Sequence, residues 1–158
     1  MTTVAELYSA LKYRVDVHPV TGARRYYNHA NQLHCEDGPA LIFPNGTGVW
    51  YHNGRRHRTD GPAVKRASGT KEWWFNGELH RDVGPAIEYR DGTMMWYQNG
   101  LRHRTVGPAI EWPGGTKEWW QNGLRHRING PAVEHADGGK EWWINGKSYT
   151  KQECQAQL

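Results

Sequence analysis

Four pairs of adjacent histidine and arginine residues are the first candidates for chemistry in this chain. They are His57–Arg58, His80–Arg81, His103–Arg104 and His126–Arg127, and His34 begins a fifth copy in which Cys35 replaces the arginine. Histidine serves as a general base, a metal ligand or a hydrogen-bond donor. Arginine offers a planar fork of donors to phosphate or carboxylate. The pairs therefore have to be tested first against metal binding and catalysis.

Metal binding is disfavoured by the spacing of the histidines. His34, His57, His80, His103 and His126 recur every 23 residues. If each repeat adds two strands that are ~4.8 Å apart, equivalent histidines lie roughly 9–10 Å from one another. Zinc holds its ligands at about 2.0–2.1 Å, so these side chains cannot share one ion. We expect no metal site and no cofactor.

Catalysis is disfavoured because every copy of the pattern offers the same residues. A general base usually works beside a distinct nucleophile or acid. Ser9, Ser68 and Ser148 are not accompanied by a recurring His-Asp arrangement. We therefore expect that the protein is not an enzyme and has no catalytic residue.

The histidines belong to a longer pattern with the same 23-residue period. Gly-Pro-Ala begins at Gly38, Gly61, Gly84, Gly107 and Gly130, and aromatic pairs begin at Trp50, Trp73, Trp96, Trp119 and Trp142. Such a fixed period indicates an array of repeated supersecondary units. The ends are irregular. Tyr26 lies 24 residues before Trp50, so one residue is inserted between Tyr27 and His34, and Tyr149-Thr150 stand where His-Arg would fall.

Each repeat has the local chemistry of β-hairpins. Asp91-Gly92 and its counterparts separate two short runs, and an Asn-Gly pair such as Asn122-Gly123 follows the second run. Both are strong tight-turn signals. The two side chains of an aromatic pair should point to opposite faces of the sheet. The sequence therefore predicts an all-β protein, an elongated antiparallel sheet of tandem 23-residue β-hairpin repeats.

Short helices are expected to cap both ends of the array. Thr3-Val4-Ala5-Glu6 and Thr150-Lys151-Gln152-Glu153 each match a capping box. Terminal repeats need polar covers, which such helices supply. We expect an N-terminal helical cap and first strand over residues 1–23, the repeats over 24–148 and a C-terminal helical cap over 149–158.

Composition limits the environment and the partners. The 158-residue chain has a formal charge of +4, and its nine Trp, eight Tyr and two Phe make it too aromatic for a disordered protein. No run approaches the ~18 apolar residues of a membrane span, and the N-terminus lacks the apolar centre of a signal peptide. Cys35 and Cys154 are interpreted as reduced thiols. We expect a cytoplasmic protein that does not bind a membrane.

The repeat resembles the membrane occupation and recognition nexus (MORN) repeat over roughly residues 24–148. The shared features are an aromatic residue, Asn-Gly, His, Gly, Asp-Gly and a second aromatic in this order at 23 residues per unit. The resemblance implies successive hairpins in one extended sheet and a scaffold that binds proteins and sometimes lipids. Arg follows His where that family has Gly, and Pro-Ala follows the next Gly. This variant is similar to repeats in uncharacterised phage and large-DNA-virus proteins, which implies a viral origin and a place in the host cytoplasm.

Two interpretations of the His-Arg pairs remain open. In the first, His bonds a backbone carbonyl and holds a tight turn, while Arg pairs with Glu88, Glu111 or Glu134 or stacks on a Trp face. In the second, His, Arg and exposed aromatic residues line a groove at ~10 Å intervals. The charge of +4 is modest for long nucleic acid, so a small anion such as a nucleotide or cyclic nucleotide fits better.

The function that we predict is non-enzymatic binding. The leading hypothesis is a protein-interaction or inhibitory module of viral type, because Trp, Tyr and Arg are enriched at binding hot spots. The alternative is sequestration of a host nucleotide signal, and homodimerisation is a third possibility. The candidate binding residues are His57, Arg58, His80, Arg81, His103, Arg104, His126, Arg127, Trp74, Tyr97, Trp120 and Trp143.

Overall fold

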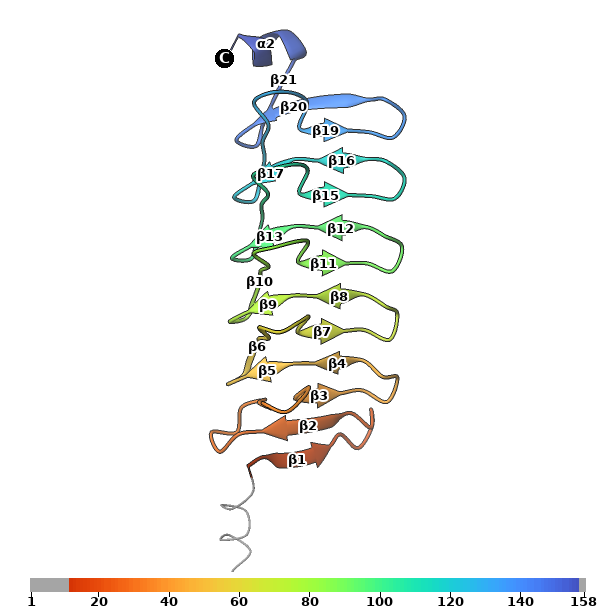
Figure 1. Ribbon diagram of the computed structural model, residues 1–158, viewed down its shortest axis with the longest axis vertical. Coiled ribbons are helices and arrows are strands. Elements are labelled where there is room, and N and C mark those ends of the chain that lie inside the picture. Colours follow the sequence, from red (N-terminus) through yellow and green to blue (C-terminus); the bar gives the residue numbers. More distant parts are fainter. Residues whose placement is uncertain (1–11, 157–158) are drawn as a thin grey trace, which may run out of the picture. The chain divides into compact units, whose positions relative to one another are not determined.

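The computed structural model describes residues 12–156, nearly all of them in short strands and tight turns (Figure 1). The chain divides into two compact units, Met1–Glu78 and Leu79–Leu158. In each unit, successive hairpins follow one another in antiparallel sheet order. The predicted all-β fold of tandem antiparallel hairpins is confirmed. Among the described residues, no helix is long and apolar enough to cross a membrane.

The first unit contains six of the thirteen sheet strands, in the order β1-β2-β3-β4-β7-β8. They are β1 (Arg14–Val17), β2 (Arg24–Tyr27), β3 (Leu41–Ile42), β4 (Gly48–Val49), β7 (Val64–Lys65) and β8 (Lys71–Glu72). A separate two-stranded hairpin is formed by β5 (Tyr51–His52) and β6 (Arg55–Arg56). The next such strands, β9 (Trp74–Phe75) and β10 (Glu78–Leu79), lie where the first unit ends.

The second unit contains the other seven sheet strands, in the order β11-β12-β15-β16-β19-β20-β21. They are β11 (Ile87–Glu88), β12 (Met94–Met95), β15 (Ile110–Glu111), β16 (Lys117–Glu118), β19 (Val133–Glu134), β20 (Lys140–Ile144) and β21 (Lys147–Tyr149). The separate hairpins here are β13 (Tyr97–Gln98) with β14 (Leu101–Arg102), and β17 (Trp120–Gln121) with β18 (Leu124–Arg125). The short helix α2 (Lys151–Gln155) follows the last strand.

Each repeat reverses the chain twice, and the sequence of each turn explains how. At the first turn, the Tyr89 amide donates to the Thr93 carbonyl at 2.9 Å. At the second, Asn122 and Gly123 have φ of 50° and 81°. A two-residue turn with positive φ at both positions matches the right-handed twist of its strands, and Asn-Gly is the preferred pair. The two predicted tight turns per repeat are confirmed.

The core is a row of small and β-branched side chains on both faces of a thin sheet. The alanine of every Gly-Pro-Ala is completely buried, namely Ala40, Ala63, Ala86, Ala109 and Ala132. Ile110 pairs with Glu118 and Glu111 with Lys117, so Ala109 and Glu111 share one face and Ile110 and Glu118 share the other. We call the first the alanine face and the second the opposite face.

The irregular ends of the array agree in part with their predictions. The Tyr26 amide donates to Ala40 and its carbonyl accepts from His34, at 2.8 and 2.9 Å, as Trp50 does with Ala63 and His57. The extra residue lies in a wider turn in which the Asn28 amide donates to Gln32, which confirms the predicted insertion. At the other end, the Thr150 hydroxyl and the Glu153 carboxylate form the predicted capping box of α2. The predicted N-terminal helix lies outside the described residues.

The alanine row leads to a prediction about packing. Ala109→Leu should lower the free energy of unfolding by about 1–3 kcal/mol, because the added methylene and methyl groups have no space on a fully buried site. Ala136→Leu, at an exposed turn position, should change it by less than about 0.5 kcal/mol. Urea denaturation of the two variants measures the difference. Equal stability of both variants would contradict a packed alanine row.

Candidate functional site

The recurring histidines hold the Asn-Gly turn of the following repeat. In each repeat, the Asn amide donates to the Nδ1 atom of the preceding repeat's His, at 3.0 to 3.2 Å. The pairs are Asn53 with His34, Asn76 with His57, Asn99 with His80, Asn122 with His103 and Asn145 with His126. In two of these pairs the side-chain oxygen of the same Asn also lies close to Nδ1, at 3.0 Å for Asn99 and 2.9 Å for Asn122. The sequence interpretation of His as the holder of a turn agrees with this geometry, but its expected partner was wrong, because the ring binds a backbone N–H and not a carbonyl.

Two backbone hydrogen bonds complete the attachment of each hairpin to the repeat before it. The Gly123 amide donates to the Arg102 carbonyl at 2.9 Å, and the Arg104 amide donates to the Trp120 carbonyl at 3.1 Å. Together with the bond between Asn122 and His103, they place the Asn-Gly hairpin on the preceding repeat. The His-Arg segment is therefore the connection between repeats.

The arginine side chains of these pairs have internal partners on the alanine face. The guanidinium carbon of Arg104 lies 3.8 Å from the ring centre of Trp96. Its Nη1 atom donates to the Pro108 carbonyl at 2.8 Å and to Glu111 at 2.7 Å. Gly107 makes room, because a Cβ atom there would lie 3.1 Å from that guanidinium. Arginine is held here by stacking and by an ion pair at the same time.

The same arrangement recurs at Arg127, and its ion pair recurs at Arg81. Arg127 lies 3.8 Å from the Trp119 ring centre and donates to Glu134 at 2.8 Å. Arg81 donates to Glu88 at 2.9 Å. The pairing with Glu88, Glu111 and Glu134 that the sequence suggested is confirmed. These three arginine side chains are each 28% exposed.

Arg58 keeps the stacking but uses another carboxylate. Lys65 occupies the position of the recurring glutamate, and Arg58 instead donates to both oxygens of Asp60, at 2.7 and 3.2 Å. This hydrogen bonding by Arg58 lowers the pKa of the Asp60 carboxyl. The guanidinium still lies 4.2 Å from the Trp50 ring centre. A change at one position of the repeat is thus compensated by another.

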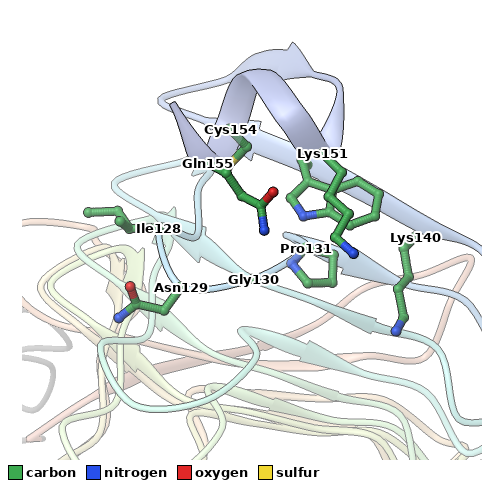
Figure 2. A pocket seen from close by; sticks show the side chains of 9 residues that line it. Ile128, Asn129, Gly130, Pro131, Lys140, Lys151, Cys154 and Gln155 are labelled. Atoms are coloured by element: carbon green, nitrogen blue, oxygen red, sulfur yellow. The ribbon is translucent and has the colours of Figure 1, made fainter. Parts of the chain in front are cut away.

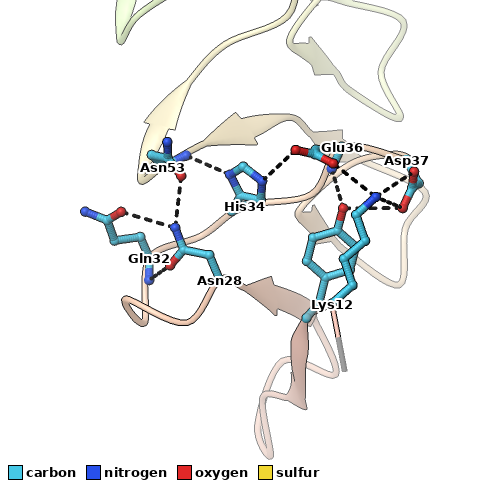
Figure 3. A network of polar contacts seen from close by, with 8 residues as sticks. Lys12, Asn28, Gln32, His34, Glu36, Asp37 and Asn53 are labelled. Carbon is cyan, nitrogen blue, oxygen red and sulfur yellow. Dashed lines mark hydrogen bonds and ion pairs between the residues drawn. The ribbon is translucent and has the colours of Figure 1, made fainter. Parts of the chain in front are cut away.

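The first repeat, which has Cys35 instead of arginine, takes its cation from an earlier part of the chain. The Lys12 ammonium lies 3.0 Å from carboxylate oxygens of both Glu36 and Asp37 (Figure 3). Hydrogen bonding with Asp37 and Glu36 raises the pKa of Lys12, and Lys12 lowers the pKa of both carboxyls. His34 lies beside this cluster, with Nε2 3.8 Å from Glu36. The network is exposed, and one ammonium group is shared by two carboxylates.

The second aromatic residue of four pairs lies on the opposite face, and its polar atom has a hydrogen bond to a neighbouring side chain. The indole nitrogen of Trp120 donates to Glu118 at 2.7 Å, that of Trp74 to Glu72 at 2.9 Å, and that of Trp143 to Glu141 at 2.8 Å. In the repeat that has Tyr97, the hydroxyl accepts from Arg102 at 3.2 Å. Each ring therefore has a fixed orientation.

A second set of arginines lies between these rings. Arg102 lies 4.9 Å from the Trp120 ring centre, and Arg125 lies 5.5 and 5.3 Å from those of Trp120 and Trp143. In the second unit the half-buried side chains of Tyr97, Arg102, Trp120, Arg125 and Trp143 thus alternate, and we call them the aromatic–arginine row. In the first unit, Arg56 lies 4.7 Å from the Trp74 ring centre.

The row borders an apolar hollow. Trp120, Leu124, Arg125 and Trp143 line a cavity of about 250 Å³ together with the glycines of two Asn-Gly turns, Gly123 and Gly146. Leu124 is half exposed, and Leu101 is exposed to the same extent in the preceding repeat. This part of the opposite face therefore combines flat rings, guanidinium groups and accessible aliphatic carbon.

The structure separates the residues that the sequence grouped as one candidate site. Arg58, Arg104 and Arg127 stack on the first aromatic residue of a pair, on the alanine face. Trp74, Tyr97, Trp120 and Trp143 lie on the opposite face, where the arginines beside them are Arg56, Arg102 and Arg125. The groove in which each His-Arg pair would join the second aromatic is not formed.

The sequence interpretation missed Glu72, Glu118 and Glu141, although a signal for them was present. Glutamate precedes the aromatic pair only in the repeats whose second aromatic is Trp. The repeats with Tyr51 and Tyr97 have Val49 and Met95 instead. This correlation has a physical reason, because the indole N–H of Trp is a donor that needs an acceptor nearby.

The chain matches no protein-family model, and no similar sequence was found among curated proteins. The tandem hairpins agree with the architecture that the MORN resemblance implies, and membership of that family stays a prediction. Within residues 12–156, no group of three or more His, Cys, Asp or Glu side chains is arranged to hold a metal ion.

The stacked arginines yield a stability prediction. Arg104→Gln should lower the free energy of unfolding by about 1–2 kcal/mol, because it leaves Glu111 unpaired and removes the cation from the Trp96 ring. Arg90→Gln removes the same charge from an exposed turn and should have little effect. Denaturation curves of both variants provide the test. If the two variants are equally stable, Arg104 does not support the fold.

Glu141 gives a pH-dependent prediction. Hydrogen bonds from His135 and then Trp143 lower the pKa of this carboxyl below its ordinary value of 4.5. A carboxyl with a lowered folded-state pKa stabilises the fold above pH 4.5, and this contribution is lost as the pH falls through the folded-state value. Glu141→Gln should therefore destabilise the protein at pH 7, and the difference from the wild type should shrink below pH 4.5.

Unfolding measured between pH 7 and pH 3 tests this expectation, with the exposed Glu78→Gln as the control variant. A difference between Glu141→Gln and the wild type that stays constant over this range would show that the charge of Glu141 is not what stabilises the fold.

Proposed function

We propose that this chain is a non-enzymatic binding protein that recognises a protein partner through the aromatic–arginine row. The observation that carries the proposal is the composition of this row, Tyr97, Arg102, Trp120, Arg125 and Trp143, beside the exposed leucines Leu101 and Leu124. Trp, Tyr and Arg are the residues most enriched at binding hot spots. Accessible apolar surface bordered by polar groups is typical of interfaces.

The fixed geometry of the row supports this role. The indoles of Trp120 and Trp143 are anchored to Glu118 and Glu141, and Arg125 lies within 3.5 Å of both carboxylates. Side chains that are already ordered lose little conformational entropy when a partner binds. A rigid row of rings is therefore better suited to recognition than flexible side chains of the same type.

The charge of the row indicates the chemistry of the partner. Arg125 is balanced by Glu118 and Glu141, whereas the hydrogen bond of the Arg102 side chain goes to the neutral hydroxyl of Tyr97. The positive charge of the Arg102 guanidinium is therefore available to pair with an acidic group of a partner. A partner segment that presents apolar side chains next to a carboxylate would complement this surface. The inhibitory role and the viral origin stay predictions from the repeat resemblance.

The alternative function, sequestration of an anion along the His-Arg pairs, is less well supported. The side chains of Arg81, Arg104 and Arg127 already donate to a proline carbonyl and to a glutamate, and the histidine Nδ1 atoms accept from the turns. An anion would have to replace these internal partners, which would cost much of the binding free energy.

The proposal is tested by affinity capture of the tagged protein from its native cells, followed by cross-linking and mass spectrometry. Arg102→Glu and Leu124→Glu each place a carboxylate on the row and should weaken capture at least tenfold. Val106→Glu introduces a negative charge at a side chain that is 81% exposed and lies outside the row, so it should leave capture unchanged. Circular dichroism would verify that all three variants fold.

Two outcomes would contradict the proposal. In the first, the row variants capture the same protein as strongly as the wild type and Val106→Glu do. In the second, native mass spectrometry finds only a homodimer, and the row variants dissociate it. That result would assign the row to self-association.

A further inference from the structure

The repeat pattern is broken beside Trp142, at the last aromatic pair. The equivalent rings of Trp50, Trp96 and Trp119 are each covered by an arginine at 3.8 to 4.2 Å. The arginine position that would cover Trp142 is occupied by Thr150, which instead caps helix α2. Within residues 12–156, no arginine or lysine stacks on the Trp142 ring. One member of the aromatic column is therefore left without its usual cover.

A cavity of about 440 Å³ lies at this position (Figure 2). Trp142 and Gly130 line it from the last repeats, and Lys151, Cys154 and Gln155 line it from α2. The buried Cys154 anchors the helix over the cavity. Its volume falls within the range of about 300–1,000 Å³ that is typical of small-molecule sites.

The lining is cationic and contains no carboxylate. Lys140 and Lys151 both border the cavity, and within the described residues neither lysine has an ion-pair partner. Glu134, which is opposite Lys140 in the strand register, is already paired with Arg127 at 2.8 Å. Two ammonium groups at one cavity favour a ligand with a phosphate or a carboxylate group.

The remaining lining suits a planar ring with polar edges. In three other repeats the face of the equivalent Trp is covered by a planar guanidinium, so a flat aromatic ring of similar thickness can occupy that place on Trp142. The amides of Asn129 and Gln155 border the same cavity and can both donate and accept hydrogen bonds. The chemistry needed for an anion and the chemistry needed for a heterocycle are thus found together.

We propose that this cavity binds a small anionic ligand of the mononucleotide class, with its ring on Trp142 and its phosphate at Lys140 and Lys151. The site goes beyond the proposed function, because it lies on the alanine face beneath α2 and shares no residue with the aromatic–arginine row. This cavity also differs from a groove along the His-Arg pairs, because it lies at the one repeat in which Thr150 occupies the arginine position beside the aromatic pair.

Titration calorimetry with adenosine 5′-monophosphate tests the proposal on the full-length protein. One molecule should bind per chain with a Kd below about 1 mM. Adenosine and inorganic phosphate should each bind at least tenfold more weakly, because each satisfies only one half of the site. The Trp142 indole signal in NMR spectra should shift on addition of the nucleotide.

Matched double variants distinguish a site from general charge attraction. Lys140→Gln with Lys151→Gln should weaken binding at least tenfold. Lys71→Gln with Lys117→Gln removes the same charge from repeat positions equivalent to Lys140 and should change the Kd less than twofold. Trp142→Leu should also weaken binding at least tenfold, and Trp142→Tyr, which keeps an aromatic ring, should bind more tightly than the leucine variant.

Three results would overturn the proposal. They are no saturable binding up to 5 mM nucleotide, equal losses in the two lysine double variants, and phosphate that binds as tightly as the nucleotide. The first result would show that the cavity does not bind the nucleotide. The second would show that binding depends only on net charge. The third would show that Trp142 does not contribute to binding.

Discussion

The attachment of each Asn-Gly hairpin to the preceding repeat is the interaction on which the rest of the structure depends. Strands of two residues make too few ladder bonds to order a sheet by themselves. The bonds from Asn122 to His103, from Gly123 to Arg102 and from Arg104 to Trp120 supply the missing order. These bonds also fix the position of the aromatic pair. Histidine is suited to this role because its side chain carries an acceptor, the Nδ1 atom, away from its own backbone to the turn of the next repeat.

Once the hairpins are attached, the two faces of the sheet acquire different chemistry. On the alanine face, arginine covers an indole and is neutralised by a glutamate of the same repeat, as Arg104 does with Trp96 and Glu111. On the opposite face, a glutamate such as Glu118 lies beneath the indole and accepts its N–H. The alanine face therefore neutralises its stacked arginines internally, whereas the opposite face leaves its rings and Arg102 partly accessible.

The period, the turns and the hairpins could be predicted from the sequence because each depends on local chemistry. An Asn-Gly pair favours a two-residue turn whatever its surroundings in the fold. The candidate site could be predicted only in part. The pairing of arginine with Glu88, Glu111 and Glu134 followed from their recurrence. The face on which Arg104 stacks depends on contacts between repeats, such as the bond from the Arg104 amide to the Trp120 carbonyl, which the order of residues along the chain does not reveal.

Positions where the repeats differ from one another carry information that the consensus does not. Lys65 replaces a glutamate, and Asp60 restores a partner for Arg58. Cys35 replaces an arginine, and Lys12 supplies a cation. In both cases a nearby charged side chain restores an ion pair. At Thr150 no such compensation occurs, so Trp142 lacks the arginine that covers the equivalent rings. The cavity beside it is lined instead by Lys140 and Lys151. The uncovered ring of Trp142 and the two ammonium groups beside it are therefore available to bind a ligand.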